Sequence, residues 1–142
     1  MQQLNLPEAK LRTREGEIFC QIRKKWLVLQ PEEWVRQHFI YMLIELLDYP
    51  KGLISVEFSM KYFQNAKRSD IVILNQDGKV FMLIECKAPD VRITNKSAKQ
   101  VAEYAKILPS KYLVLTNGIK HYTWKKVADH YQQQSTFPIY KG

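Results

Sequence analysis

The stretch Val80-Phe81-Met82-Leu83-Ile84-Glu85-Cys86-Lys87 tells more about this protein than any other part of its sequence. Its first five residues are all apolar, which is typical of a strand that is buried on both faces. Glu85 and Lys87 then follow two residues apart, and side chains at that spacing point to the same face of a strand. A carboxylate and an ammonium group therefore leave the sheet side by side. They are either a functional pair or an ordinary surface pair at the end of a strand.

A hairpin connects this strand to the one before it. Residues 69–74 and residues 79–87 both have the composition of strands, and Asp77-Gly78 between them is a strong turn signal. With Asp77-Gly78 as a two-residue loop, Asp70 lies opposite Glu85 in the antiparallel pair. A slip of one residue would place these two carboxylates on different faces of the sheet.

Opposed carboxylates repel each other, so this arrangement favours a bound cation. Mg²⁺ prefers oxygen ligands and commonly takes one or two carboxylates together with a substrate phosphate. Lys87 shares the face of Glu85, and the same register pairs Lys87 with Arg68 on the preceding strand. A lysine beside such a metal can orient or deprotonate water, or stabilise charge on a phosphate oxygen. The pattern therefore points to phosphate chemistry.

The rest of the chain predicts an α/β fold. Residues 31–47 have the pattern of an amphipathic helix that begins with a proline followed by Glu32 and Glu33. A second helix is expected at residues 95–108 between two strands, and that order favours a right-handed crossover with parallel pairing. The expected architecture is a mixed sheet of about five strands flanked by helices. A short hairpin is expected at residues 17–22 and 26–29, and the remaining strands at residues 53–62, 112–116 and 119–124.

Length and charge set the expectations for domains and partners. The 142 residues correspond to one domain, which we divide into an N-terminal arm at residues 1–15 and a single domain at residues 16–142. The formal net charge is +8, and the excess lies after residue 50 because the first 50 residues are balanced. A basic surface favours a polyanion, most often nucleic acid. Between residues 91 and 126 only one acid accompanies the basic side chains of Arg92, Lys96, Lys99, Lys106, Lys111, Lys120, Lys125 and Lys126.

Several classes of protein are disfavoured. No apolar run is long enough to cross a membrane, and the N-terminus lacks the pattern of a signal peptide. Cys20 and Cys86 are isolated, so we expect reduced thiols and a cytoplasmic location. The three histidines are scattered, which disfavours a zinc site. No phosphate-binding loop of the Gly-x-x-x-x-Gly-Lys type is present, so the chain is not an ATP-driven motor by itself.

Five short motifs occur in an order that resembles the PD-(D/E)xK nuclease superfamily. The fullest resemblance is to the N-terminal nuclease domain of type I restriction enzyme motor (R) subunits and its stand-alone relatives. It covers residues 23–126 and departs at Ser69, where the superfamily's name has a proline. The motifs are Pro31-Glu32-Glu33-Trp34-Val35-Arg36-Gln37, Arg68-Ser69-Asp70-Ile71-Val72, Ile84-Glu85-Cys86-Lys87-Ala88-Pro89, Gln100-Val101-Ala102-Glu103-Tyr104 and Leu115-Thr116-Asn117-Gly118.

The resemblance implies a metal-dependent DNA endonuclease with a restriction-endonuclease-like fold. It implies that Asp70 and Glu85 hold Mg²⁺, with Mn²⁺ as a substitute, and that Lys87 assists the attacking water. Glu33 would contribute to the site from the first helix, with Glu32 as the alternative. For both glutamates the competing interpretation is stabilisation of the helix, since acids are favoured in a first turn.

The resemblance also places two residues of the second helix beside the site. Gln100 and Tyr104 are four residues apart and therefore share one helix face. The alternative for Tyr104 is a place in the hydrophobic core. The residues expected to bind DNA or to support the site are Gln100, Tyr104, Arg68, Arg92, Lys96 and Lys99.

The expected partner is double-stranded DNA, bound through its phosphates without strong base specificity. Cleavage of both strands usually needs two sites, so a homodimer or a larger restriction-type complex is expected, and no membrane partner. The competing function is a non-catalytic nucleic-acid-binding or assembly module that retains the nuclease fold. The presence of Asp70, Glu85 and Lys87 favours the enzyme, because a module without chemistry has no need of them.

Overall fold

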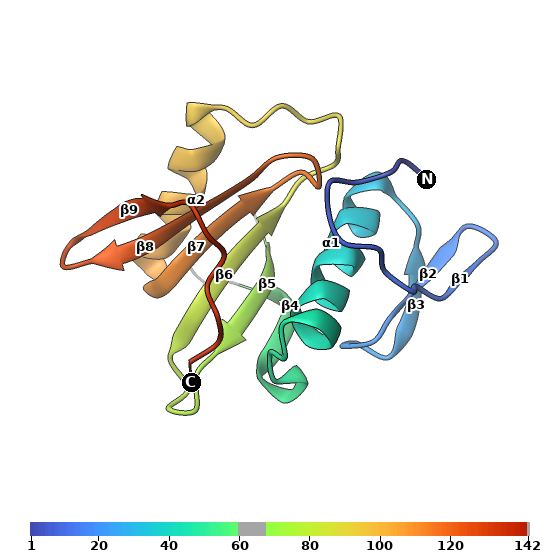
Figure 1. The fold of residues 1–142 in the computed structure, drawn as a ribbon, viewed down its shortest axis with the longest axis horizontal. Coiled ribbons are helices and arrows are strands. Elements are labelled where there is room, and N and C mark those ends of the chain that lie inside the picture. The colour runs from blue at the N-terminus through green and yellow to red at the C-terminus, as the bar shows by residue number, and fades with distance from the viewer. Residues whose placement is uncertain (60–67, 142) are drawn as a thin grey trace.

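A six-stranded mixed sheet forms the centre of the computed structural model, which describes residues 1–59 and 68–141 (Figure 1). At positions 57–59 and 68–70 the structure describes only the backbone. The strand order is β4-β5-β6-β7-β8-β9, in which β6 and β7 pair in parallel and all other neighbours are antiparallel. The strands are β4 (Ile54–Ser59), β5 (Arg68–Leu74), β6 (Val80–Cys86), β7 (Ser110–Thr116), β8 (His121–Val127) and β9 (His130–Gln134).

Two helices lie on opposite faces of this sheet (Figure 1). Helix α1 (Pro31–Tyr41) covers one face and continues as a π-helical turn, and α2 (Asn95–Ile107) covers the other. A separate three-stranded sheet lies beyond α1, on the side away from the large sheet (Figure 1). The small elements are β1 (Thr13–Arg14), β2 (Glu17–Cys20), β3 (Lys25–Val28), the π-helical turn (Met42–Leu46) and a 3₁₀ turn (Lys51–Leu53).

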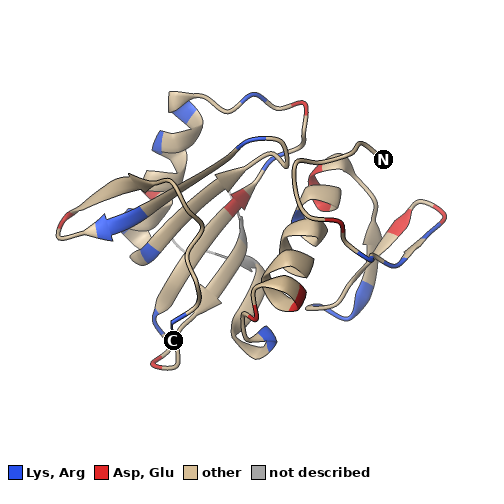
Figure 2. Ribbon diagram, viewed as in Figure 1, with Lys and Arg blue, Asp and Glu red and all other residues tan. Residues whose placement is uncertain are grey.

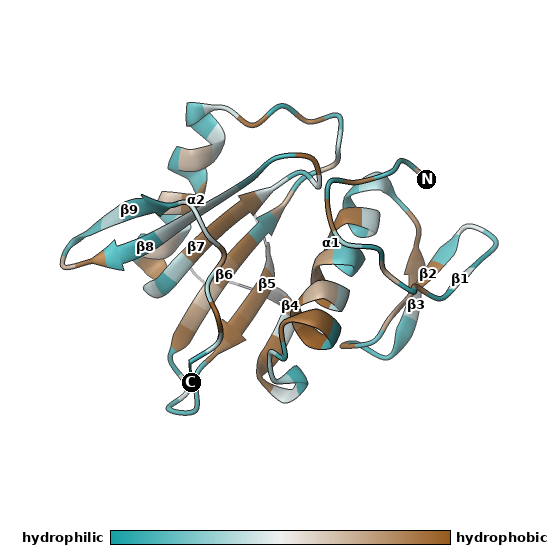
Figure 3. Ribbon diagram, in the orientation of Figure 1, coloured by the Kyte–Doolittle hydropathy of each residue, from teal (hydrophilic) through white to brown (hydrophobic). Residues whose placement is uncertain are grey.

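Alternation along the inner strands divides the core into two clusters. Ile71 and Ile84 belong to the cluster under α1, whereas Val72 and Leu83 belong to the cluster under α2. Figure 3 shows that the inner strands are hydrophobic along most of their length, as burial on both faces requires. Glu85 is two residues from Leu83, so it lies on the α2 side of the sheet.

The turn between β5 and β6 differs from the predicted two-residue loop. The Asn75 and Lys79 backbones close a three-residue loop, with Asn75 N–H donating to Lys79 O at 2.8 Å and Gly78 at a positive φ of 79°. This turn alone would shift the register by one residue. A bulge between Ile73 and Leu74 shifts it back, so Ile71 pairs with Ile84 as the sequence predicted.

Both ends of the described chain pack against the folded core. Leu4 and Leu6 contact the cluster under α1, and Asn5 N–H donates to Gly118 O at 2.8 Å. The C-terminal segment crosses the α1 side of the sheet (Figure 1), where the Tyr140 hydroxyl donates to Leu74 O. The division into an arm at residues 1–15 and a domain at residues 16–142 stays a prediction.

The predicted elements are confirmed, with shifts of one to three residues at several ends, and β1 is an addition to the predicted hairpin. The larger differences are as follows. The first helix was expected to run to residue 47, but regular α-helix ends at Tyr41 and a π-helical turn follows. The large sheet has six strands instead of about five, because β9 was not predicted. Of the strand predicted at residues 53–62, residues 54–59 form β4 and residues 60–62 lie outside the described part. No helix in the described ranges is long and apolar enough to cross a membrane.

Candidate active site at the end of strand β6

The charged pair at the end of β6 is partly buried. The Lys87 ammonium nitrogen lies 3.3 Å from Glu85 Oε1, and the Glu85 residue is only 7% exposed. Parallel pairing with β7 continues past the strand, because Lys87 N–H donates to Thr116 O at 2.8 Å. The backbone under both charges is therefore held by the neighbouring strand. An ordinary surface pair at a strand end would be more exposed than this one.

The β5 backbone brings the Asp70 position to the same end of the sheet. Ile71 pairs with Ile84, so the residue before Ile71 is Asp70 and the residue after Ile84 is Glu85. This register agrees with the predicted opposition of the two positions. The role of Asp70 stays a prediction, as does that of Arg68, which pairs through its backbone with Ser59.

The loop after β7 supports the same end of the sheet. Asn117 is 6% exposed, and its side-chain oxygen accepts hydrogen bonds from the backbone N–H groups of Ile119 and Lys120. Its amide group donates to Val91 O at 2.9 Å, which ties this turn to the connection between β6 and α2. Sequence reasoning singled out Asn117 only as part of a motif and gave it no role. The signal was an Asn-Gly pair directly after a strand.

Glu33 and Glu32 differ sharply in their surroundings. Glu33 is buried, and its carboxylate accepts hydrogen bonds from the Arg36 guanidinium and from Gln37 Nε2. Glu32 is exposed and lies 3.4 Å from Arg36. The structure thus selects Glu33 as the inward-facing residue. Among the described residues, the hydrogen-bond partners of this carboxylate all belong to α1, so a direct part in catalysis stays a prediction.

The expected residues of α2 are divided between core and surface. Tyr104 is 4% exposed and packs with Val72, Leu83 and Leu115, which fits its alternative interpretation as a core aromatic. Gln100, one turn earlier, is exposed. Arg92, Lys96 and Lys99 are also exposed, as residues that contact a polyanion must be.

The basic residues of the second half do not form one continuous edge. Because α2 runs back along the sheet, its first turn lies toward the Glu85 end and its last turn toward the opposite end (Figures 1 and 2). Lys106 is paired with Glu103 at 2.9 Å, and Lys111 lies over the ring of Phe81 near the start of β6. The cations at the Glu85 end are Lys87, Arg92, Lys96, Lys99 and Lys120, and those toward the other end are Lys106, Lys111, Lys125 and Lys126.

The donor set at this strand end fits a hard divalent cation only with Asp70 included. Among the residues whose side chains are described, no three acidic, histidine or cysteine groups gather closely enough to hold a metal. Glu85 provides one carboxylate, and the second that the sequence predicts belongs to Asp70, for which the structure describes the backbone alone. Carboxylate oxygens are the ligands that Mg²⁺ takes in proteins, usually one or two of them.

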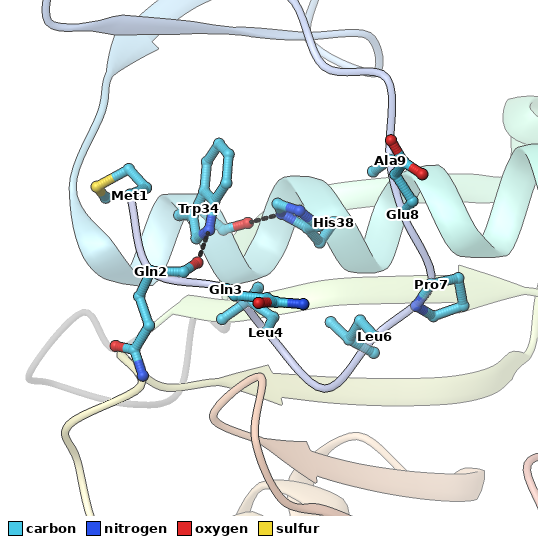
Figure 4. Close-up of a pocket in the computed structure, with 10 residues that line it drawn as sticks. All are labelled: Met1, Gln2, Gln3, Leu4, Leu6, Pro7, Glu8, Ala9, Trp34 and His38. Atoms are coloured by element: carbon cyan, nitrogen blue, oxygen red, sulfur yellow. Dashed lines mark hydrogen bonds between the residues drawn. The ribbon is translucent and has the colours of Figure 1, made fainter.

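A pocket with a volume of about 450 Å³ lies between the N-terminal arm and α1, away from the end of β6. There the Trp34 indole N–H donates to Gln2 O at 2.8 Å (Figure 4). Burial lowers the pKa of His38 in its wall, and a hydrogen bond to Trp34 O opposes that effect in part. None of the predicted site residues lines this pocket, which is lined by Met1, Gln2, Gln3, Leu4, Leu6, Pro7, Glu8, Ala9, Trp34 and His38.

The fold and the strand end define the class of protein. A mixed sheet with helices on both faces, and a Glu-x-Lys pair at the end of its central strand, is a restriction-endonuclease-like arrangement. Residues 31–138 match the family described as the Type I restriction enzyme R protein N terminus, and the chain belongs to that family. The match begins at α1, so the three-stranded sheet lies before it. Among curated proteins, none matches the chain.

Proposed function

We propose that this protein is a metal-dependent DNA endonuclease that hydrolyses phosphodiester bonds at the end of β6. The main support is the Glu85–Lys87 pair, 3.3 Å apart and partly buried, beside a β5–β6 register in which Ile71 pairs with Ile84. Continued by one residue, that register would bring position 70 opposite position 85. Membership of a family of restriction enzyme N-termini gives the chain a restriction-related role and makes DNA the expected substrate.

Asp70 and Glu85 are the residues that would hold Mg²⁺ or Mn²⁺. When bound, such an ion stabilises charge on the scissile phosphate and makes an attacking water more acidic. Lys87 would orient that water or stabilise the charge that develops on a phosphate oxygen. The ion pair with Glu85 positions the Lys87 ammonium group, and the hydrogen bond from Lys87 N–H to Thr116 O fixes the Lys87 backbone against β7.

The test is cleavage of supercoiled and linear DNA in Mg²⁺ or Mn²⁺, with EDTA as the metal-free control. The parent protein is expected to cut DNA only with metal, and Asp70→Asn is expected to lose cutting. Asp77→Asn is the matched control because Asp77 lies exposed in the β5–β6 turn, at the opposite end of the strand pair.

Equal cutting by Asp70→Asn and the parent would contradict the proposal. Salt-sensitive DNA binding that survives chelation, without cleavage in either metal, would favour a non-catalytic nucleic-acid-binding or assembly module. Cutting that appears only with added partner subunits would retain the nuclease and place it in a larger complex.

A further inference from the structure

A small pocket on the α2 side of the sheet is lined by two stacked aromatic rings. Tyr122 and Trp124 of β8 lie with their ring centroids 6.2 Å apart and their planes only 23° apart. The pocket has a volume of about 190 Å³, and the opening turn of α2 forms its opposite wall. This volume is below the ~300 Å³ from which drug-sized ligand sites begin, so it suits one flat ring system. Its lining residues are Ile93, Thr94, Asn95, Ala98, Tyr122, Trp124 and Gln133.

The sheet register connects this pocket to the proposed catalytic end. Glu85 pairs with Leu115, and Leu115 pairs with Tyr122, so the three residues form one row across β6, β7 and β8. Directly paired residues on adjacent strands point to the same face. Two strand spacings of about 4.8 Å put Tyr122 roughly 10 Å from Glu85. That distance is about three base steps along one DNA strand.

The polar groups of the pocket suit the edge of a nucleobase. Asn95 and Gln133 place side-chain amides at its walls, and amides donate to and accept from base edges. In the part of the chain that the structure describes, neither amide makes a hydrogen bond to another residue. Exposed Lys96 and Lys99 follow Asn95 on α2 and supply positive charge for the connecting phosphates. Flat aromatic faces with nearby cations are the usual means of holding unpaired bases.

We propose that this pocket binds one unpaired base of a DNA strand whose backbone passes the Glu85–Lys87 end of β6. The proposal rests on the proposed nuclease function and narrows its substrate to DNA with unpaired nucleotides within a few positions of the cut. A protein partner fits less well, because the pocket is small and its cationic surroundings match a polyanion.

The first experiment compares the affinity of the protein for a duplex with a single-stranded overhang and for the matching blunt duplex. Ca²⁺ replaces Mg²⁺ so that binding is measured without turnover, by fluorescence anisotropy. Stacking of one base on an aromatic side chain is worth a factor of roughly 5 to 140 in affinity. Tyr122→Ala and Trp124→Ala are expected to lose that preference, while Tyr122→Phe and Trp124→Phe retain most of it. Trp26→Ala on β3 is the matched control, because Trp26 is also half-buried but lies in the other sheet.

The second experiment changes the DNA and starts from the parent protein, since Trp124 also packs on the core under α2 and its truncation can disturb folding. Abasic sites are placed one at a time along the overhang, so that a ring is removed while its phosphate remains. We expect one position to weaken binding by at least about 5-fold. The same abasic site should have little further effect in Tyr122→Ala, as coupling in a double-mutant cycle requires.

The outcomes separate the pocket from the nuclease. If the parent cuts DNA with metal but prefers no overhang, and no abasic position matters, the base pocket is wrong and the nuclease stands. If Tyr122→Ala and Trp124→Ala bind the overhang as tightly as the parent, the pocket is likewise wrong. If the protein neither binds nor cuts any DNA, both proposals fail together.

Discussion

Some residues near the candidate site are proposed to act in catalysis, whereas others stabilise the fold. In α1, the buried Glu33 carboxylate accepts hydrogen bonds from Arg36 and Gln37 of its own helix. Buried charges are costly unless they are paired, so this cluster must remain complete for α1 to pack. Adjacent Glu32 is exposed and contributes little, as surface ion pairs do.

We expect Glu33→Gln to lower the free energy of unfolding by about 1–3 kcal/mol, because it removes the charged acceptor of two buried hydrogen bonds. Glu32→Gln should change it by less than ~0.5 kcal/mol. Chemical denaturation of the two variants checks this. Equal effects of the two substitutions would show that the hydrogen bonds of Glu33 with Arg36 and Gln37 do not stabilise α1.

His38 makes stability depend on pH. Burial lowers its pKa below 6.5, so the unfolded chain binds a proton more readily than the folded protein does. Its contribution to stability is complete above pH 6.5 and is lost as the pH falls through that value toward the folded pKa. The unfolding free energy of the parent should therefore fall between pH 7.5 and 5.5 more steeply than that of His38→Gln. Exposed His130→Gln is the control and should keep the slope of the parent.

At the scale of elements, the β7–β8 turn is the point where the N-terminal arm, α1 and the sheet meet. Gly118 has a φ of 84°, and a Cβ added there would lie 2.9 Å from Leu4 and 3.0 Å from Val35. The turn is further fixed by Thr116, whose oxygen accepts from Gly118 N–H at 2.9 Å and lies 2.7 Å from His121 Nδ1.

We expect Gly118→Ala to destabilise the protein by about 1–3 kcal/mol or more, from backbone strain and from displacement of Leu4. Gly78→Ala tests the strain alone, because its φ is 79° and no atom lies within 4 Å of the added Cβ. Gly52→Ala has neither feature and should be nearly neutral. Thermal unfolding of the three variants should rank Gly118→Ala lowest, and any other order contradicts this view of the turn.

Elements with strong local signals were predictable from the sequence, and those fixed by tertiary contacts were not. The apolar β6 strand and the register of Ile71 with Ile84 follow from the pattern alone. The compensating bulge between Ile73 and Leu74 does not, because the extra residue opposite it, Phe81, lies in a run of apolar residues where the sequence shows no alternation to interrupt. Strand β9 was missed because its turn has Ala128 at a positive φ, where Gly or Asn is expected, and because its glutamines are weak strand formers.

The site was predictable to a similar degree. The shared face of Glu85 and Lys87 follows from a spacing of two, and the structure confirms their contact. Burial of Glu33 instead of Glu32 depends on how α1 rotates against its neighbours, which local spacing does not determine. The aromatic pocket needed β8 and α2 to be brought together, although Tyr122 and Trp124 are visible as a pair in the sequence.

For the whole molecule, the distribution of positive charge determines how a polyanion can lie. Cations at the Glu85 end flank the proposed site, while the others lie toward the opposite end of the strands (Figure 2). DNA held for cleavage at β6 should therefore depend on the first group. Each lost phosphate contact lowers the salt dependence of binding by about one unit of slope.

We expect the double variant Lys96→Ala and Lys99→Ala to reduce the slope of log K against log salt concentration by about 1–2. The matched double variant Lys125→Ala and Lys126→Ala, on β8 toward the opposite end, should leave the slope close to that of the parent. Binding isotherms at several salt concentrations measure this. Equal losses in both variants would mean that the bound DNA also contacts the opposite end of the sheet and is not confined to the Glu85 end.

The most direct measurement is the initial rate at which Lys87→Ala cleaves supercoiled DNA in Mg²⁺, compared with the parent and with Lys79→Ala. Lys79 is exposed at the far end of the hairpin and carries the same charge, so it controls for general electrostatics. A lysine that assists the attacking water should contribute about 10²- to 10⁴-fold, so Lys87→Ala should fall by that factor while Lys79→Ala stays near the parent rate. A Lys87→Ala protein that is folded and cuts at the rate of the parent would contradict a nuclease site at the end of β6.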